Sequence, residues 1–193
     1  MAINKKQVVQ PEVSRIKFDK EIAEFLQIED DWRKKGVICL KAEFPVIQFI
    51  FIATHTKPQT VAFAVSIDFA NYDIEPPSAV FINPFTLEPV ATKDMQVGFF
   101  QVVNQTQQIQ GLQQFQMQVP NQILMQGLND RPFLCIQGIR EYHDHPAHTD
   151  NPWLNHRTRG EGNLFFVLSQ LYNHCIPHIT GFNMQVNFSL KQF

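Results

Sequence analysis

The chain has few glycines, and they do not cluster in a way that could cradle a phosphate group. Only eight occur in 193 residues, whereas a phosphate-binding loop needs several closely spaced ones so that backbone N–H groups can approach the ligand. A Gly-x-Ser-x-Gly elbow is also missing from the sequence. These two absences argue against nucleotide hydrolysis and serine hydrolase chemistry.

Long apolar runs and basic stripes are lacking as well. Residues 1–15 are polar, and the longest apolar runs have only the length of a strand, so the sequence predicts neither a signal peptide nor a membrane-spanning helix. The formal net charge is -2, and the basic cluster that stands out is Arg33, Lys34 and Lys35. Because nucleic acid normally selects a broader basic surface, we expect neither nucleic acid nor a membrane as a partner.

Cysteine is scarce. Cys39, Cys135 and Cys175 are odd in number and far apart, whereas a disulfide framework needs paired cysteines in an oxidising compartment. A chain of this length can also bury a core that needs no covalent staples. We therefore expect free thiols, a cytoplasmic location and a single domain over residues 1–193.

What the first half does contain predicts a helix followed by a sheet. Apolar residues recur at helical spacing from Ser14 to Lys35, with Ser14 as the N-cap and Gly36 as the stop, while residues 1–13 are expected to be flexible. Four runs rich in β-branched and aromatic residues then predict an antiparallel meander. They are residues 37–43, 46–54, 61–69 and 78–82, and together with the helix they occupy residues 14–85.

The second half is expected to be less regular. Residues 86–130 form a long insertion, in which residues 96–126 hold twelve glutamines among apolar residues, and this composition favours a polar, partly β-structured segment. Residues 131–193 hold a Cys/His segment, a helix and a tail with strand-like alternation. The helix, over Glu161–Cys175, would pack one face on the sheet, namely Leu164, Phe165, Leu168 and Leu171. Helices against one face of an antiparallel sheet make an α+β fold.

The side chains best suited to chemistry are concentrated between residues 135 and 156. Four of the seven histidines lie there, together with one cysteine and the carboxylates Glu141 and Asp144. Thiolates and imidazoles attack carbonyl groups or bind borderline metals near neutral pH. The members of this group are Cys135, Glu141, His143, Asp144, His145, His148 and His156.

The order of elements and three motifs resemble the ubiquitin-conjugating enzyme family. Residues 63–85, with the Pro76-Pro77 corner, are similar to its signature of strand, Pro-Pro pair and strand. The run Arg131-Pro-Phe-Leu-Cys135-Ile is similar to its cysteine strand, and Asn151-Pro-Trp153-Leu to its tryptophan element. The resemblance spans roughly residues 15–175. It implies an N-terminal helix, a four-stranded antiparallel meander, a cysteine segment and a C-terminal helix, here with a long Gln-rich insertion that the family does not have.

This resemblance implies a bacterial conjugating enzyme for a ubiquitin-like protein. The modifier would be carried as a thioester on Cys135 and passed to a lysine or hydroxyl of a target protein, without a required cofactor. His143, His145 and His148 would activate the thiol or the incoming group. The family's His-Pro-Asn tripeptide is missing, and Asn129 is the nearest counterpart of its oxyanion-supporting asparagine.

The implied partners are the ubiquitin-like modifier, an adenylating activating enzyme and a target protein. In the family the first helix meets the activating enzyme. Arg33, Lys34 and Lys35 at the end of the predicted helix suit an electrostatic contact of that kind.

Two alternatives remain open. The segment also resembles a bacterial family of predicted metal-binding domains with a Cys, Glu, His, His pattern, which implies a zinc-binding accessory protein of a ubiquitin-like pathway. Cys135, Glu141, His145 and His148 would be the zinc ligands, and all four are acceptable ligand types. The other alternative is a catalytically silent variant of the fold that only binds the modifier.

Overall fold

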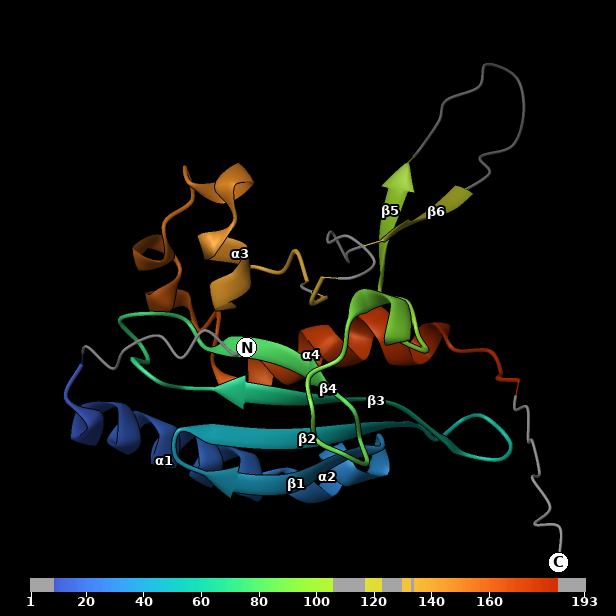
Figure 1. Cartoon of the computed structure of the whole chain (residues 1–193), viewed down its shortest axis with the longest axis horizontal. Helices are drawn as coiled ribbons and strands as arrows, with labels where there is room; N and C mark the ends of the chain where they lie inside the picture. The colour runs from blue at the N-terminus through green and yellow to red at the C-terminus, as the bar shows by residue number, and fades with distance from the viewer. Residues whose placement is uncertain (1–8, 106–116, 123–129, 133, 184–193) are drawn as a thin grey trace, which may run out of the picture.

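The computed structural model describes residues 9–105, 117–122, 130–132 and 134–183, which form an α+β fold (Figure 1). Four strands make an antiparallel sheet in the order β1-β2-β3-β4, each pairing with the next along the chain. The predicted meander is confirmed, and its strand ends lie within one residue of the predicted ones. The strands are β1 (Val37–Glu43), β2 (Val46–Ala53), β3 (Thr60–Asp68) and β4 (Ser78–Ile82).

Strand β2 shows how the sequence divides the sheet into two faces. Ile47, Phe49 and Phe51 are fully buried, and the residues between them are half-buried, because successive side chains of a strand point to opposite faces. The ring of Phe25 meets the ring of Phe49 edge to face, with centroids 5.2 Å apart. The buried face is therefore the one that the first helix covers, and phenylalanine builds much of this core.

The predicted first helix is two helices, and its predicted start at Ser14 is wrong. The first begins at Pro11, whose fixed φ and missing N–H suit the first helical position, so residues 11–13 are helical and Ser14 is buried in the first turn. The helix breaks at Ile28, where φ is −123°, and the acids that follow favour a new helix N-terminus. The stop at Gly36 is confirmed, with φ at +85°. The two helices are α1 (Pro11–Gln27) and α2 (Glu29–Lys34).

The helix α4 (Leu164–Cys175) packs on the sheet largely as predicted. Its N-cap is Asn163, whose side-chain oxygen accepts a hydrogen bond from the Phe166 backbone N–H at 2.7 Å. The predicted inner face is confirmed for its three leucines, which are buried. It is wrong for Phe165, which is 57% exposed because it lies one position round the helix from Leu164.

The predicted insertion contains two strands within its described part. They are β5 (Phe100–Gln105) and β6 (Met117–Gln122), which pair antiparallel in a sheet of their own. Much of the remaining Gln-rich sequence, and the predicted strand of the tail after residue 183, lie outside the described residues.

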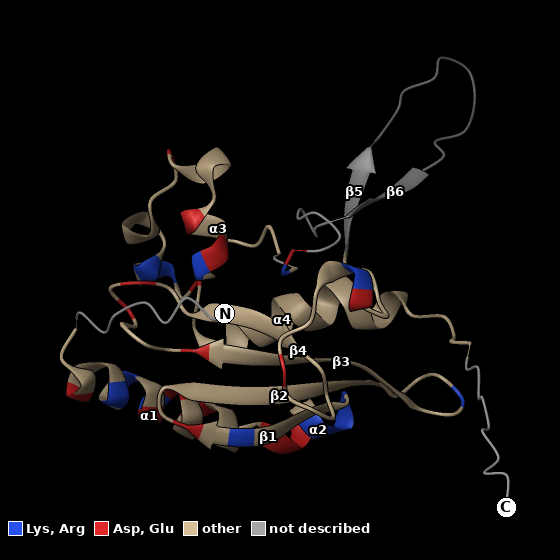
Figure 2. Cartoon of the chain, in the orientation of Figure 1, with Lys and Arg blue, Asp and Glu red and all other residues tan. Residues whose placement is uncertain are grey.

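Charge is distributed unevenly over the elements. Helices α1 and α2 carry both signs, whereas α4 carries none (Figure 2). None of the helices within the described ranges is both long enough and apolar enough to cross a bilayer.

Candidate functional site

Cys135 lies on the chain segment between β6 and the short helix that begins at Arg140. Leu134 before it and Ile136 after it are buried at 1% and 7% exposure, while the thiol residue between them is half-buried. This alternation turns the flanking apolar side chains into the core and the cysteine outward. The short helix α3 (Arg140–Asp144) follows, beyond β4 at the edge opposite β1 (Figure 1).

Helix α3 is attached to the Pro-Pro corner and to the start of β4. The Arg140 backbone N–H donates to the Pro77 carbonyl at 2.9 Å. The Glu141 carboxylate accepts hydrogen bonds from the Ser78 hydroxyl and, at 3.1 Å, from the Ala79 N–H. Burial raises the pKa of Glu141, although both of these bonds oppose that rise. Glu141 thus acts as a structural tie between the cysteine segment and the sheet.

Two glycines let the cysteine segment approach the start of α4. Gly138 and Gly162 have φ values of +94° and +92°, which favour glycine. A Cβ at Gly138 would lie 2.7 Å from the Gly162 nitrogen, and one at Gly162 would lie 2.8 Å from the Gly138 oxygen and 2.7 Å from the Trp153 ring. The two backbones therefore meet at contact distance, with the indole packed over them.

The Cys135 thiol lies against one histidine. Its Sγ is 3.3 Å from His148 Nε2, and His148 belongs to the 3₁₀ turn Pro146–His148. The imidazole stacks on the buried Tyr142 ring, with centroids 4.0 Å apart and planes 13° apart. The Tyr142 hydroxyl in turn accepts a hydrogen bond from Asn151 Nδ2 at 3.2 Å. A fixed aromatic ring thus holds the imidazole beside the sulfur.

This pairing has a chemical consequence, because the thiol alone is a poor nucleophile at neutral pH. Burial raises the pKa of the Cys135 thiol, so the reactive thiolate would be scarce without a base. His148 is within hydrogen-bonding reach and can accept the thiol proton. A thiol and an imidazole at this distance can serve as a nucleophile and its general base.

The other two predicted histidines have different environments. His145 Nδ1 accepts a hydrogen bond from the Ala147 N–H at 3.2 Å, and its ring centroid is 5.6 Å from that of His148. His143 Nδ1 lies 2.9 Å from the Asn151 carbonyl oxygen, and burial lowers the pKa of His143. Among the described residues, His148 is thus the histidine that contacts the thiol.

Sequence reasoning missed a buried polar network beside this site. His156 is buried at 5% exposure, and its two ring nitrogens contact the Glu161 carboxylate and the Asn151 side-chain oxygen. Trp153 Nε1 donates to the Asp73 carbonyl at 2.8 Å, which attaches this network to the turn after β3. The available signal was weak, since an acid five residues after a histidine has no regular spacing in a helix or a strand.

The predicted zinc ligands are only partly close to one another. Cys135 and His148 are adjacent, but the Glu141 carboxylate is engaged by β4 and His145 binds its own turn. In the part of the chain that the structure describes, no group of three His, Cys, Asp or Glu side chains is placed to hold a metal ion. Zinc usually takes four ligands, so a zinc site remains a prediction that requires His145 and Glu141 to leave these contacts.

The asparagine proposed for the oxyanion, Asn129, lies outside the described residues, and its role stays a prediction. Asn83, another asparagine upstream of the cysteine, is engaged in its own turn. Its side-chain oxygen accepts hydrogen bonds from the N–H groups of Phe85 and Thr86 at 2.8 and 3.1 Å.

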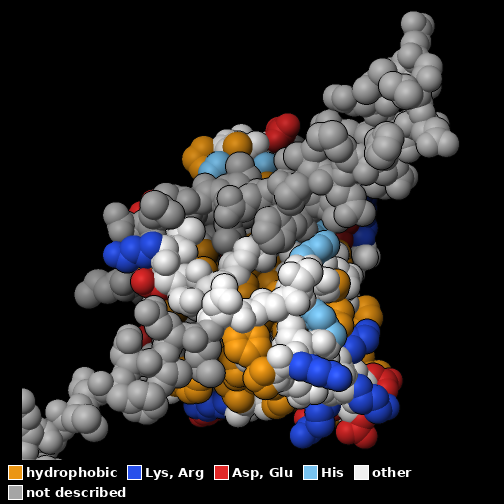
Figure 3. Space-filling view, turned by 90° about the vertical axis from the view of Figure 1, so that its right-hand side faces the viewer, with side chains coloured by type: hydrophobic (Ala, Val, Ile, Leu, Met, Phe, Trp, Pro, Cys, Tyr) orange, Lys and Arg blue, Asp and Glu red, His pale blue; other side chains and the backbone are white. Residues whose placement is uncertain are grey.

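The predicted partner-binding cations lie at the end of α2. Arg33 pairs with Glu29 at 2.8 Å and Lys34 with Asp31 at 2.9 Å, while Lys35 lies over aromatic rings. Figure 3 shows basic and acidic side chains gathered together at the lower right of that view. A contact with a partner through Arg33 or Lys34 would therefore compete with these local pairs.

Comparison with known proteins assigns the chain to a family. Residues 9–179 match the model of the Y4jH-like family, described as the Y4jH family. The chain is also similar to the protein named "Uncharacterized protein y4jH" of Sinorhizobium fredii, at 42% identity over 173 residues, which cover 87% of this chain and 84% of the relative. The matched range includes both Cys135 and His148 as well as all four strands of the main sheet. The chain is a member of the Y4jH-like family.

Proposed function

We propose that this chain is a conjugating enzyme for a ubiquitin-like protein and carries the modifier as a thioester on Cys135. The observation that carries the proposal is the 3.3 Å contact between Cys135 Sγ and His148 Nε2. It pairs a half-buried thiol with a base, which is the arrangement that covalent acyl transfer through cysteine needs.

The reaction would proceed in two balanced steps. First, His148 takes the thiol proton and the Cys135 thiolate attacks the carbonyl carbon of the modifier's C-terminal thioester on the activating enzyme. The activating enzyme's thiolate leaves and takes up that proton from His148, so that His148 can act again in the second step. Second, a target amine or hydroxyl attacks the new thioester carbonyl. A C–N or C–O bond forms, the C–S bond breaks, and the proton lost by the attacking group returns to the Cys135 thiolate through His148.

The arrangement of the fold supports the same proposal. A helical segment, a four-stranded meander, a cysteine segment and a final helix follow in the order that the conjugating-enzyme resemblance implies. The buried pair Pro76-Pro77 lies at the corner before β4. Its carbonyl at Pro77 receives the hydrogen bond from α3, so this corner positions the segment that holds Cys135.

The proposed partners are the modifier, an adenylating activating enzyme and a target protein. Arg33, Lys34 and Lys35 would contact the activating enzyme, and the ion pairs of α2 would open on binding. His143 and His145 would not act on the thiol directly in this scheme. The ring of His145 instead lies beside that of His148, with centroids 5.6 Å apart.

The second candidate is a zinc-binding accessory protein of the same pathway. The observation that favours it is also the Cys135–His148 contact, since a thiolate and an imidazole on one zinc ion must lie close together. Cys135 and His148 would supply two of the ligands. A modifier-binding variant without catalysis is the third candidate, and one experiment separates the three.

The experiment combines the chain with an activating enzyme and a ubiquitin-like modifier from the same genome, with ATP. Non-reducing gels and intact mass should show one modifier on the chain, released by a reductant and by hydroxylamine. The adduct should disappear in Cys135→Ala and persist in Cys39→Ala, which removes another half-buried thiol.

The conjugating proposal would be overturned if the activating enzyme accepts the modifier but the chain stays unmodified. Stoichiometric zinc by elemental analysis, lost in both Cys135→Ala and His148→Gln, would then favour the accessory protein. Modifier binding without adduct or zinc would favour the silent variant.

A further inference from the structure

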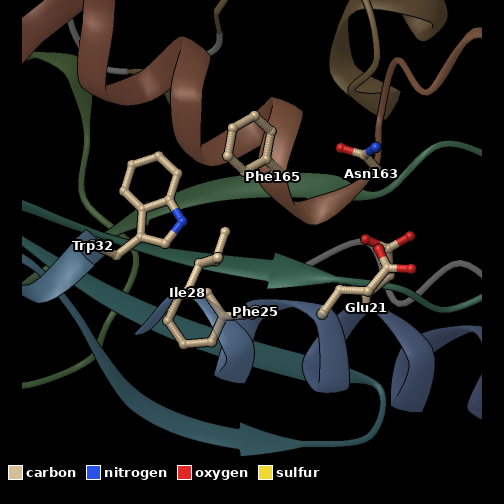
Figure 4. A pocket seen from close by; sticks show the side chains of 7 residues that line it. Glu21, Phe25, Ile28, Trp32, Asn163 and Phe165 are labelled. Atoms are coloured by element: carbon tan, nitrogen blue, oxygen red, sulfur yellow. The ribbon is translucent and has the colours of Figure 1, made fainter. Parts of the chain in front are cut away.

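A pocket lies between the first two helices and the start of α4, away from the cysteine site (Figure 4). Its volume is about 270 Å³, which is room for one bulky side chain and not for a folded element. Apolar side chains make up most of the wall, with carboxylates and an amide at one end. The lining residues are Glu21, Glu24, Phe25, Ile28, Trp32, Asn163 and Phe165.

Trp32 presents an unused hydrogen-bond donor to this pocket. The residue is only 4% exposed, and its ring is held by edge contacts with Phe165 and Tyr172 at 5.8 and 6.4 Å. Figure 4 shows the indole nitrogen turned toward the space that Phe165 and Ile28 border. Within the described residues, Trp32 Nε1 donates to no acceptor. This nitrogen is not one of the fully buried polar atoms that lack a partner, so it is open to the pocket. A carbonyl group of a ligand at this position would give it an acceptor.

The opposite end of the pocket is acidic. Glu21 lies at the pocket in Figure 4, and its carboxylate accepts hydrogen bonds from the Leu164 N–H at 2.8 Å and the Tyr72 hydroxyl at 3.3 Å. The Glu24 side chain is 56% exposed and pairs only loosely with Lys20, at 3.6 Å. Two carboxylates thus face one end of an otherwise apolar wall, which complements a cation.

We propose that this pocket receives one bulky apolar side chain from a segment of a partner protein, with a lysine or arginine of the same segment beside Glu21 and Glu24. A polypeptide fits all three features at once. Its side chain fills the apolar wall, its backbone carbonyl accepts from Trp32 Nε1, and its neighbouring basic residue meets the carboxylates. The pocket does not involve Cys135, so this docking site is independent of the proposed transfer reaction.

The indole N–H groups allow a direct test, because the chain has only two tryptophans. Random twelve-residue peptides displayed on phage are selected against the full chain, and the enriched peptides are synthesised. In ¹⁵N-labelled protein, these peptides should shift the Trp32 indole cross-peak, identified by its loss in Trp32→Phe. The Trp153 cross-peak should stay in place, because that N–H is already bonded to Asp73.

The enriched peptides should contain Lys or Arg next to Phe, Leu, Met or Trp. Glu24→Lys should weaken their binding about 10-fold or more by reversing the charge of an exposed residue, and Trp32→Phe should weaken it as well. Asp19→Lys, a charge change of the same size on α1 outside the pocket lining, is the matched control and should bind normally. Failure to select any peptide would overturn the proposal. So would peptides that are acidic, or that bind without moving the Trp32 cross-peak.

Discussion

Cys135 Sγ and His148 Nε2 lie 3.3 Å apart, although thirteen positions separate the two residues in the chain. The stacked Tyr142 ring holds the imidazole at that distance. The imidazole within reach of the thiol therefore comes from a turn after α3, and not from the residues next to the cysteine.

Replacing His148 should slow the reaction of Cys135 with an alkylating agent. Because burial raises the pKa of this thiol, His148→Gln should lower the alkylation rate at pH 7 by about 10- to 100-fold. In this variant the alkylation rate should rise only as the pH passes above the ordinary pKa of a cysteine thiol. Iodoacetamide labelling followed by peptide mass spectrometry gives the rate for each cysteine. Cys39 is the internal reference, and an unchanged Cys135 rate would show that His148 is not its base.

A methyl group at Gly162 should destabilise the fold strongly. In Gly162→Ala the new Cβ would meet the Trp153 ring and the Gly138 carbonyl at a φ of +92°, which should cost about 3 kcal/mol in the free energy of unfolding. Urea denaturation measures this value. The matched control is Gly181→Ala, whose Cβ meets nothing within 4 Å and which should leave stability unchanged. Equal stability of the two variants would contradict the close backbone approach.

The four strands of the sheet could be predicted because their side chains follow the alternation that a two-faced sheet imposes. The helical segment before them was harder, since its periodicity continues through the break at Ile28. Only the backbone geometry there, and the acids that begin α2, separate the two helices. Phe165 was misplaced because an apolar residue next to Leu164 reads as part of the same face, whereas it lies beside Trp32.

The candidate site was predictable in composition but not in pairing. The sequence places four histidines near Cys135, and no spacing rule distinguishes His148 from His145 or His143. The choice depends on tertiary contacts, in which His143 binds the Asn151 carbonyl and His148 stacks on Tyr142. The engagement of Glu141 by β4 likewise joins residues far apart in the chain.

The two tryptophans should respond differently to the loss of their N–H groups. Trp153→Phe removes a donor bonded to the Asp73 carbonyl at 2.8 Å, whereas Trp32→Phe removes one that has no acceptor within the described residues. Both changes shrink a buried ring, so the difference between them reports the hydrogen bond. We expect Trp153→Phe to lower the free energy of unfolding by about 1–3 kcal/mol more than Trp32→Phe. A larger loss in Trp32→Phe would contradict these assignments.

Glu21 should make stability depend on pH in a definite direction. Burial raises the pKa of its carboxyl group in the folded chain, so the folded state holds the proton more tightly than the unfolded state does. The resulting stabilisation is complete below the unfolded pKa and is lost as the pH rises through the folded pKa. Glu21→Gln keeps acceptor and donor groups for Leu164 and Tyr72 but cannot ionise.

The stability of the wild-type chain relative to Glu21→Gln should therefore increase as the pH falls from 7 to about 4. Urea denaturation at several pH values measures the difference. Glu24→Gln, at an exposed position on the same helix, is the control. Its free energy of unfolding should change with pH in nearly the same way as that of the wild type. An opposite slope for Glu21→Gln would mean that its hydrogen bonds outweigh its burial.

The backbone of Gly138 fills the space that a side chain at Gly162 would need, and the backbone of Gly162 does the same for Gly138. The two positions therefore constrain one another during evolution. A larger residue at either position closes the gap that the other requires, and no change at the second glycine can restore it. We expect divergent relatives that retain the cysteine segment and its contact with the start of α4 to retain both glycines together, even where their histidines differ. The two glycines together would then identify this part of the fold in chains whose chemistry has changed.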